Sequence, residues 1–228
     1  MRSRILILLS AKSIILFLVI SSAVYAQADN ARPLPQFLFP GFGSGIVKSK
    51  SGPYLTFKLN YDMLDEKMVT EKGGVYRLLG NIEDVDTVYL QGRIFVPIDN
   101  FFCELVAVGD APFFIRYKCY LVSSGTTVGY GVKSQGVGPT EYRRFELGSD
   151  VVNIDLPPDN NVEVSSVNMV RVNDKIQKFA NERQLKKLFP DHARQLEEYF
   201  KTNNVDFKSR EFIVKLGAFC NSLLDSGK

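Results

Sequence analysis

The sequence has no tryptophan, a single histidine, His192, and only three cysteines among its 228 residues. A zinc site built from His and Cys needs several such ligands, and no Cys-x-x-Cys spacing is present. A Ser–His–Asp or Cys–His enzyme would have to use His192, yet no Gly-x-Ser-x-Gly motif accompanies it. No motif in the chain therefore predicts a catalytic residue, a metal ligand or a cofactor-binding residue, and we expect no cofactor.

The first 26 residues have the pattern of a secretory signal peptide. Basic residues lie near the N-terminus, residues 14–23 are almost wholly apolar, and small residues precede the expected cleavage site between Ala26 and Gln27. The alternative is a retained membrane anchor. Lys12 interrupts the apolar run, however, and leaves it well short of the roughly 20 residues that span a bilayer.

Removal of this leader changes the net charge. The full chain has 28 Lys and Arg against 25 Asp and Glu. Arg2, Arg4 and Lys12 belong to the leader, which has no acidic residue, so the mature chain has 25 residues of each sign. A neutral chain lacks the basic surface that releases counterions from nucleic acid. We predict an exported protein that is periplasmic, associated with the outer membrane or secreted, without a nucleic-acid partner or a transmembrane helix in the mature chain.

Residues 44–180 have the pattern of a β-rich domain. In "YLTFKLN" polar and apolar residues alternate, which is the period of a half-buried strand. Two-residue turns are predicted at Gly73-Gly74, Gln91-Gly92 and Asn173-Asp174. The acidic residues of "NIEDVDTVYLQGRIFVP" thus stand where a strand–turn–strand unit begins, and they do not predict a catalytic site. Residues 27–43, rich in Pro and Gly, are expected to form a linker or extended arm.

The aromatic-rich segment 100–122 reads as a long hairpin around "GDAP". If Val108 lies opposite Phe114, Cys103 lies opposite Cys119 at a separation near that of a disulfide. One hypothesis is therefore a cross-strand disulfide, and the other is two buried thiols. A register slip of one residue would remove the opposition.

The segment 123–144, "SSGTTVGYGVKSQGVGPTEYRR", is the longest irregular stretch of the chain. It is not a P-loop, because Val132 separates Gly131 from Lys133. Long loops in compact domains often carry function. We therefore take Tyr130, Lys133 and Gln135 as candidate partner-binding residues.

Residues 181–225 have the pattern of about three short helices. Asn181, with Gln184 three residues later, predicts a capped start, and Pro190 ends that helix. Ser209 is expected to cap the last helix, whose apolar stripe includes Cys220. The expected fold class is α+β: an antiparallel β-rich N-terminal module followed by a short C-terminal helical segment. Whether these helices pack on the sheet or form an appendage stays open at this point.

Two blocks carry a family resemblance: "LNYDMLDEKMV…YRLLGNIEDVDTVYLQGRIFVP" and "KIQKFANERQLKKLFPDHARQLEEYFKTNNVDFKSREFIVKL". In this order, behind a signal peptide, they resemble uncharacterised exported proteins of Bacteroidota over roughly residues 44–216. The resemblance implies export and the order β then α. That group has no assigned activity, so it supplies no catalytic residues.

These observations favour a non-enzymatic exported cell-envelope or secreted protein, a binding module whose partner is a protein, a glycan or a second copy. The alternative is a hydrolase that acts on envelope polysaccharide or peptidoglycan through a carboxylate pair, because such a pair leaves no spacing in the sequence. A third expectation is a structural protein whose exposed edge strands pair with a neighbour, with the hairpins 85–97 and 100–122 as the candidate edges.

Overall fold

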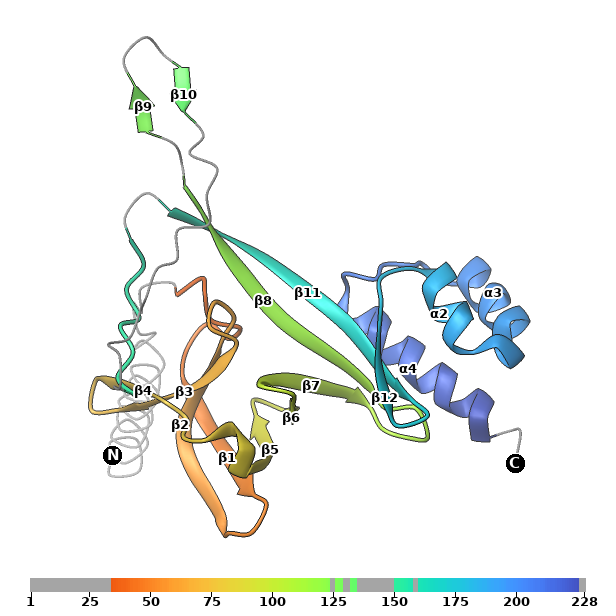
Figure 1. Ribbon diagram of the computed structural model, residues 1–228, viewed down its shortest axis with the longest axis horizontal. Helices are drawn as coiled ribbons and strands as arrows, with labels where there is room; N and C mark the ends of the chain where they lie inside the picture. The colour runs from red at the N-terminus through yellow and green to blue at the C-terminus, as the bar shows by residue number, and fades with distance from the viewer. Residues whose placement is uncertain (1–33, 124–125, 129–131, 135–149, 158–159, 226–228) are drawn as a thin grey trace, which may run out of the picture. The chain divides into compact units, whose positions relative to one another are not determined.

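The computed structural model describes residues 34–123, 126–128, 132–134, 150–157 and 160–225 (Figure 1). Its main element is one ten-stranded antiparallel sheet with the strand order β12-β11-β8-β7-β6-β5-β1-β2-β3-β4. The strands of this sheet are β1 (Gly43–Ser49), β2 (Tyr54–Asp62), β3 (Lys67–Lys72), β4 (Val75–Leu78), β5 (Val85–Leu90), β6 (Arg93–Ile98), β7 (Phe101–Ala107), β8 (Phe113–Ser123), β11 (Asn160–Val172) and β12 (Lys175–Phe179). A separate pair consists of β9 (Thr126–Val128) and β10 (Val132–Ser134).

Helices follow the sheet in the chain. They are α2 (Glu182–Leu188), α3 (Ala193–Thr202) and α4 (Arg210–Asp225), with the short 3-10 turn η2 (Pro190–His192) between α2 and α3. Another 3-10 turn, η1 (Ile82–Asp84), lies between β4 and β5. The N-cap of α2 is Asn181, whose side chain accepts from the backbone N–H of Gln184 at 2.9 Å. The expected α+β class, an antiparallel β-rich part followed by three C-terminal helices, is confirmed.

The predicted two-residue turns are present. Gly73-Gly74 joins β3 to β4, Gln91-Gly92 joins β5 to β6, and Asn173-Asp174 joins β11 to β12. Both central residues of each turn have positive φ, which is the conformation of the tight hairpin turn that matches strand twist. Local sequence therefore sets these three registers.

The register of the β7–β8 hairpin differs from the expected one. Leu105, not Val108, lies opposite Phe114, and a bulge follows between Leu105 and Ala107. Cys103 consequently does not oppose Cys119, and the two thiols belong to different hydrophobic clusters. All three cysteines of the chain are buried and free. The structure thus corresponds to the second of the two hypotheses, buried thiols.

The two hairpins expected to offer exposed edges lie inside the sheet. β5 has β1 and β6 as neighbours, β6 has β5 and β7, and β7 has β6 and β8. Their positions correct the expectation that hairpins 85–97 and 100–122 are edge strands. The sheet instead ends at β4 and at β12.

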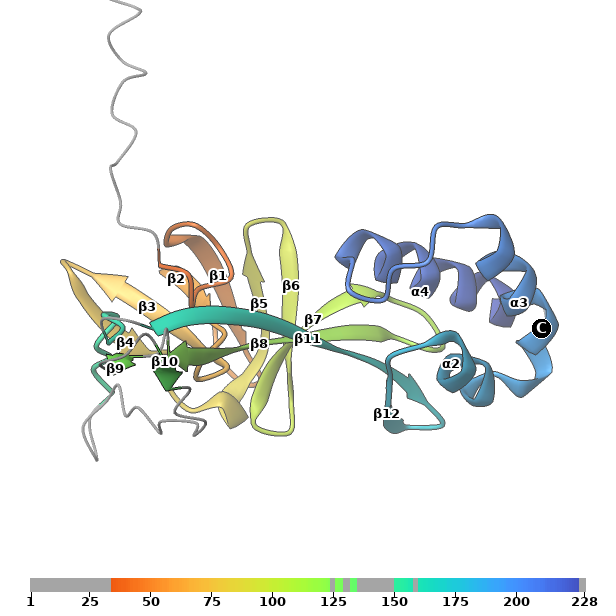
Figure 2. The same cartoon turned by 90° about the horizontal axis from the view of Figure 1, so that it is seen from above.

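The helices pack against the sheet. α4 contacts β7 and β8, and α2 contacts β12, at the end of the long strands β8 and β11 that Figures 1 and 2 show side by side. Gly217 of α4 allows close approach, since a Cβ there would lie 2.7 Å from the Cβ of Ala107. Asn221 closes the same contact through hydrogen bonds with the backbone N–H and C=O of Ala111 at 2.9 and 3.0 Å. The question left open by the sequence is resolved: these helices belong to the sheet's own core.

Part of the expected arm also belongs to this core. Phe37 and Phe39 are buried, and Leu38 donates its backbone N–H to the carbonyl of Tyr61 at 2.9 Å. The side chain of Asn60 bonds the backbone N–H and C=O of Phe39. Residues 37–39 of the segment expected to be a linker or arm are therefore buried or hydrogen-bonded against the sheet.

Candidate functional site

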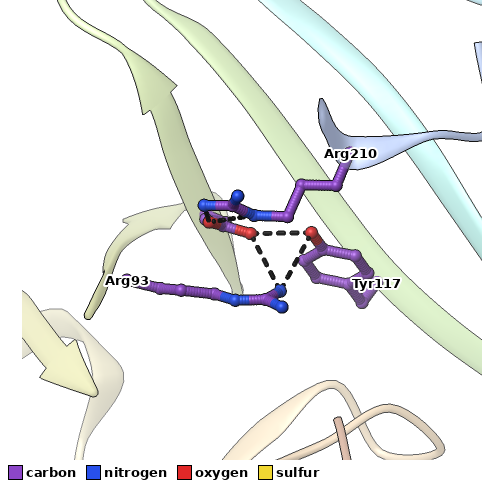
Figure 3. A network of polar contacts seen from close by, with 4 residues as sticks. Arg93, Tyr117 and Arg210 are labelled. Carbon is purple, nitrogen blue, oxygen red and sulfur yellow. Dashed lines mark hydrogen bonds and ion pairs between the residues drawn. The ribbon is translucent and has the colours of Figure 1, made fainter. Parts of the chain in front are cut away.

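A fully buried carboxylate lies where the sheet meets the helices. Glu104 of β7 has no exposed surface. One oxygen accepts from Nε and a terminal nitrogen of Arg210 at 2.8 and 2.5 Å. The other accepts from the Tyr117 hydroxyl at 2.7 Å and from Arg93 at 3.4 Å. Figure 3 shows Arg93, Tyr117 and Arg210 converging from β6, β8 and the start of α4.

Tyr117 and Arg210 keep their protons in this network. Burial and the nearby carboxylate raise the pKa of Tyr117, so its hydroxyl stays a donor. The hydrogen bonds to Glu104 raise the pKa of Arg210 further above its usual range. Both carboxylate oxygens are occupied by donors from the chain itself, which is how a buried charge is stabilised. The arrangement is suited to joining β6, β7, β8 and α4, not to moving a proton.

A second ion pair ties the turn between β2 and β3 to β8. Arg116 donates to both carboxylate oxygens of Glu66, one of them at 2.9 Å. Its guanidinium also lies 3.3 Å from the ring centroid of Phe101, a cation–π contact. Burial raises the pKa of the adjacent Cys103 thiol to about 12, and burial alone raises that of Cys220 to about 12. Neither thiol is a thiolate near neutral pH, so neither is an activated nucleophile.

A groove of about 640 Å³ opens between the sheet and the helical part. Residues 164–168 of β11 form one wall, with Tyr117 of β8 beside them. Residues 178–180 at the end of β12, Gln184 of α2, and Phe207 and Lys208 between α3 and α4 complete the described lining. Because Tyr117 belongs both to the groove and to the Glu104 network, the network fixes part of the groove wall.

The groove combines apolar surface with a few polar groups. Phe179 and Phe207 contribute aromatic rings 6.1 Å apart between centroids. Lys178 and Lys208 are exposed at the groove. Among the described residues that line it, none is Asp, Glu, His or Cys. The described lining therefore offers no carboxylate pair, which the hydrolase alternative requires at a separation of roughly 5–9.5 Å.

Asn168 is the polar group of this groove that stands out. It is 4% exposed, and its side-chain N–H donates to the carbonyl of Phe207 at 2.7 Å. Its Oδ1 is buried without a hydrogen-bond partner. Buried acceptors are normally paired, and an unpaired one costs free energy. A ligand that brings an N–H or O–H donor into the groove would pair it.

The structure describes little of the cleavage site and the partner-binding loop proposed from the sequence. Ala26, Gln27, Tyr130 and Gln135 fall outside the described residues, and Lys133 lies on β10 with a side chain that is not described. Sequence reasoning missed the groove because its lining comes from four separate segments. One local signal was present: "VEVSSVN" is a regular strand that carries a buried amide and neither Lys nor Pro.

Within the described residues, no three His, Cys, Asp or Glu side chains gather closely enough to hold a metal ion. No helix among them has the length and apolar character needed to cross a bilayer. Comparison of the chain with family models, with curated proteins and with solved structures finds no match in any of the three.

Proposed function

We propose that the mature chain is a non-enzymatic exported protein of the cell envelope or the secreted fraction, and that it binds a partner in the groove beside β11. The leader pattern of residues 1–26 supports export. The groove supports binding: it is large enough for a ligand, partly apolar, and furnished with a few polar groups, as ligand sites usually are.

The observation that carries this proposal is the unpaired Oδ1 of Asn168 in the groove. Oε1 of Gln36 is also buried without a partner but is not among the described groove lining, whereas the buried carboxylate of Glu104 is fully paired by its own chain. A buried acceptor left open beside a cavity is the group that a ligand would complete.

A photo-crosslinking residue tests this function in cells. We would introduce the photo-crosslinking residue in place of Gln184 or Lys208, both exposed groove residues. The same replacement at Lys215, an exposed residue of α4 outside the groove lining, is the matched control. The proposal expects the same adduct from the two groove positions and none from position 215. It also expects the processed chain in the envelope or medium. Recovery of the intact, leader-bearing chain from the cytosol would refute export, and no adduct at either groove position under several growth conditions would refute groove binding.

A further inference from the structure

The outer edge of the long strand β11 has a neighbouring strand along only part of its length. β8 pairs with β11 from Asn160 to Val170, whereas β12 pairs with β11 only from Asn168 to Val172. Within the described part of the chain, no strand therefore pairs with the outer edge of residues 162–167. These residues run directly into the groove, which includes residues 164–168.

The backbone groups on this edge can be assigned from the ladder. Arg171 donates its N–H toward the β8 side, to the carbonyl of Pro112. Alternate residues of an antiparallel strand face the same neighbour, and the β11–β8 register is continuous. Val162, Val164 and Ser166 therefore direct both N–H and C=O away from β8. This gives an evenly spaced row of three donors and three acceptors.

The edge has few of the features that usually protect such strands. Proteins block open edges with charged side chains (Lys above all), Pro or a bulge; the sequence of residues 162–167, "VEVSSV", has one charged residue, the exposed Glu163, and no Lys, Pro or bulge. Val164 is 61% exposed. At the opposite end of the sheet, residues 150–152 cover β4: Leu78 donates to Asp150, and Val152 donates to Tyr76, at 2.8 and 2.9 Å. One end of the sheet is thus covered, whereas none of the residues that the structure describes pairs with the β11 edge.

The groove at the end of this edge favours an acidic ligand. Lys178 and Lys208 line it, and no described carboxylate is part of that lining, although the exposed Glu163 stands on the adjoining edge. Neither lysine has an ion-pair partner among the described residues. A ligand that satisfies all these features must supply backbone-like donors and acceptors in a row, a donor for Asn168 and a negative charge.

We propose that an extended peptide segment with an acidic side chain adds to the sheet as a strand along residues 162–167 of β11. Its backbone pairs with Val162, Val164 and Ser166, in the manner of other sheet-edge complexes. One of its N–H groups pairs with Oδ1 of Asn168, and its carboxylate lies by Lys178 and Lys208. This inference rests on the proposed function and names the ligand class for the same groove.

The test selects peptides from a library of random octapeptides displayed on phage, against the purified full chain. The proposal expects selected peptides that are rich in Asp or Glu, rich in β-branched residues and poor in Pro. Val164→Pro removes one outward N–H, and proline is tolerated at such edge positions; it should weaken binding of the selected peptides by about tenfold or more. Val164→Ala keeps that N–H and should change binding by less than about threefold.

Two further measurements test the charge contribution and guard against a proline variant that does not fold. Lys178→Gln with Lys208→Gln should weaken binding by about tenfold, whereas Lys187→Gln with Lys215→Gln, the same charge change outside the groove lining, should not. If the Val164→Pro variant fails to fold, peptides with N-methylated backbone amides are tested against the unchanged protein instead. One set of peptides is methylated at odd positions and the other at even positions. Only the set whose methylated amides face β11 should lose binding.

Peptides that bind the proline variant as well as the unchanged chain, or a selection that enriches no peptide, would overturn strand addition. If either of these results is obtained but a groove adduct forms in cells, the proposed function still holds and the ligand belongs to another chemical class. Absence of any groove adduct would refute the proposed function itself.

Discussion

The charged network around Glu104 predicts a large loss of stability when one side chain is neutralised. Glu104→Gln keeps the size of the side chain but removes the negative charge that Arg93 and Arg210 face. Removal of one partner from a buried ion pair costs about 3–5 kcal/mol, because the remaining charge is left uncompensated. The two arginine side chains are 27% and 31% exposed, so water partly solvates them. We therefore expect a loss near the lower end of that range, about 3 kcal/mol.

Urea unfolding followed by circular dichroism measures this loss. With a slope of about 2 kcal/mol per molar, the midpoint should fall by about 1.5 M while the slope stays unchanged. Asp150→Asn is the matched control, because the Arg77–Asp150 pair at 2.6 Å is 51% and 58% exposed. Such exposed pairs contribute less than about 1 kcal/mol. If the two variants lose the same free energy, the network does not hold the sheet and α4 together as argued.

Three further predictions concern the core. Asn221→Ala should lower the free energy of unfolding by about 3 kcal/mol, since it leaves the buried N–H and C=O of Ala111 unpaired; chemical unfolding measures it. Gly217→Ala should lower the thermal midpoint although alanine favours helix by about 1 kcal/mol, because its Cβ would lie 2.7 Å from that of Ala107. Without reductant, a thiol reagent at pH 8 should react slowly with the native protein, since burial raises the pKa of Cys103 to about 12, and should find three thiols after unfolding.

Controls for these predictions come from the same chain. Asn203→Ala, which removes an exposed bond to the carbonyl of Tyr199 at 2.8 Å, should cost less than about 1 kcal/mol. Gly80→Ala, where an added Cβ meets nothing within 4 Å, should be neutral or mildly stabilising. If Asn203→Ala lowers stability as much as Asn221→Ala, or Gly80→Ala as much as Gly217→Ala, the packing of α4 described above is contradicted. A single thiol after unfolding would show that two cysteines are bonded.

Local features of this fold were readable from the sequence. The turns at Gly73-Gly74, Gln91-Gly92 and Asn173-Asp174, and the cap at Asn181, depend on residues that are adjacent in the chain. The class, sheet then helices, follows from the change of apolar period after residue 180. Such features are decided by φ preference, capping and alternation, which a linear pattern contains.

Long-range features were not readable. The β7–β8 register includes a bulge between Leu105 and Ala107, so the register under which Cys103 would oppose Cys119 is not the one formed. Glu104 looked like one more strand residue until the fold brought Arg210 to it from 106 positions away. Among the described residues, β12 pairs with only the last part of β11 before the chain continues into helices, and the groove lies beside the part of β11 that it leaves without a partner strand. The sequence by itself determined the local elements and their order, because those depend on near neighbours; tertiary structure alone decided which edge stays open and which polar groups meet, because those depend on packing between distant segments.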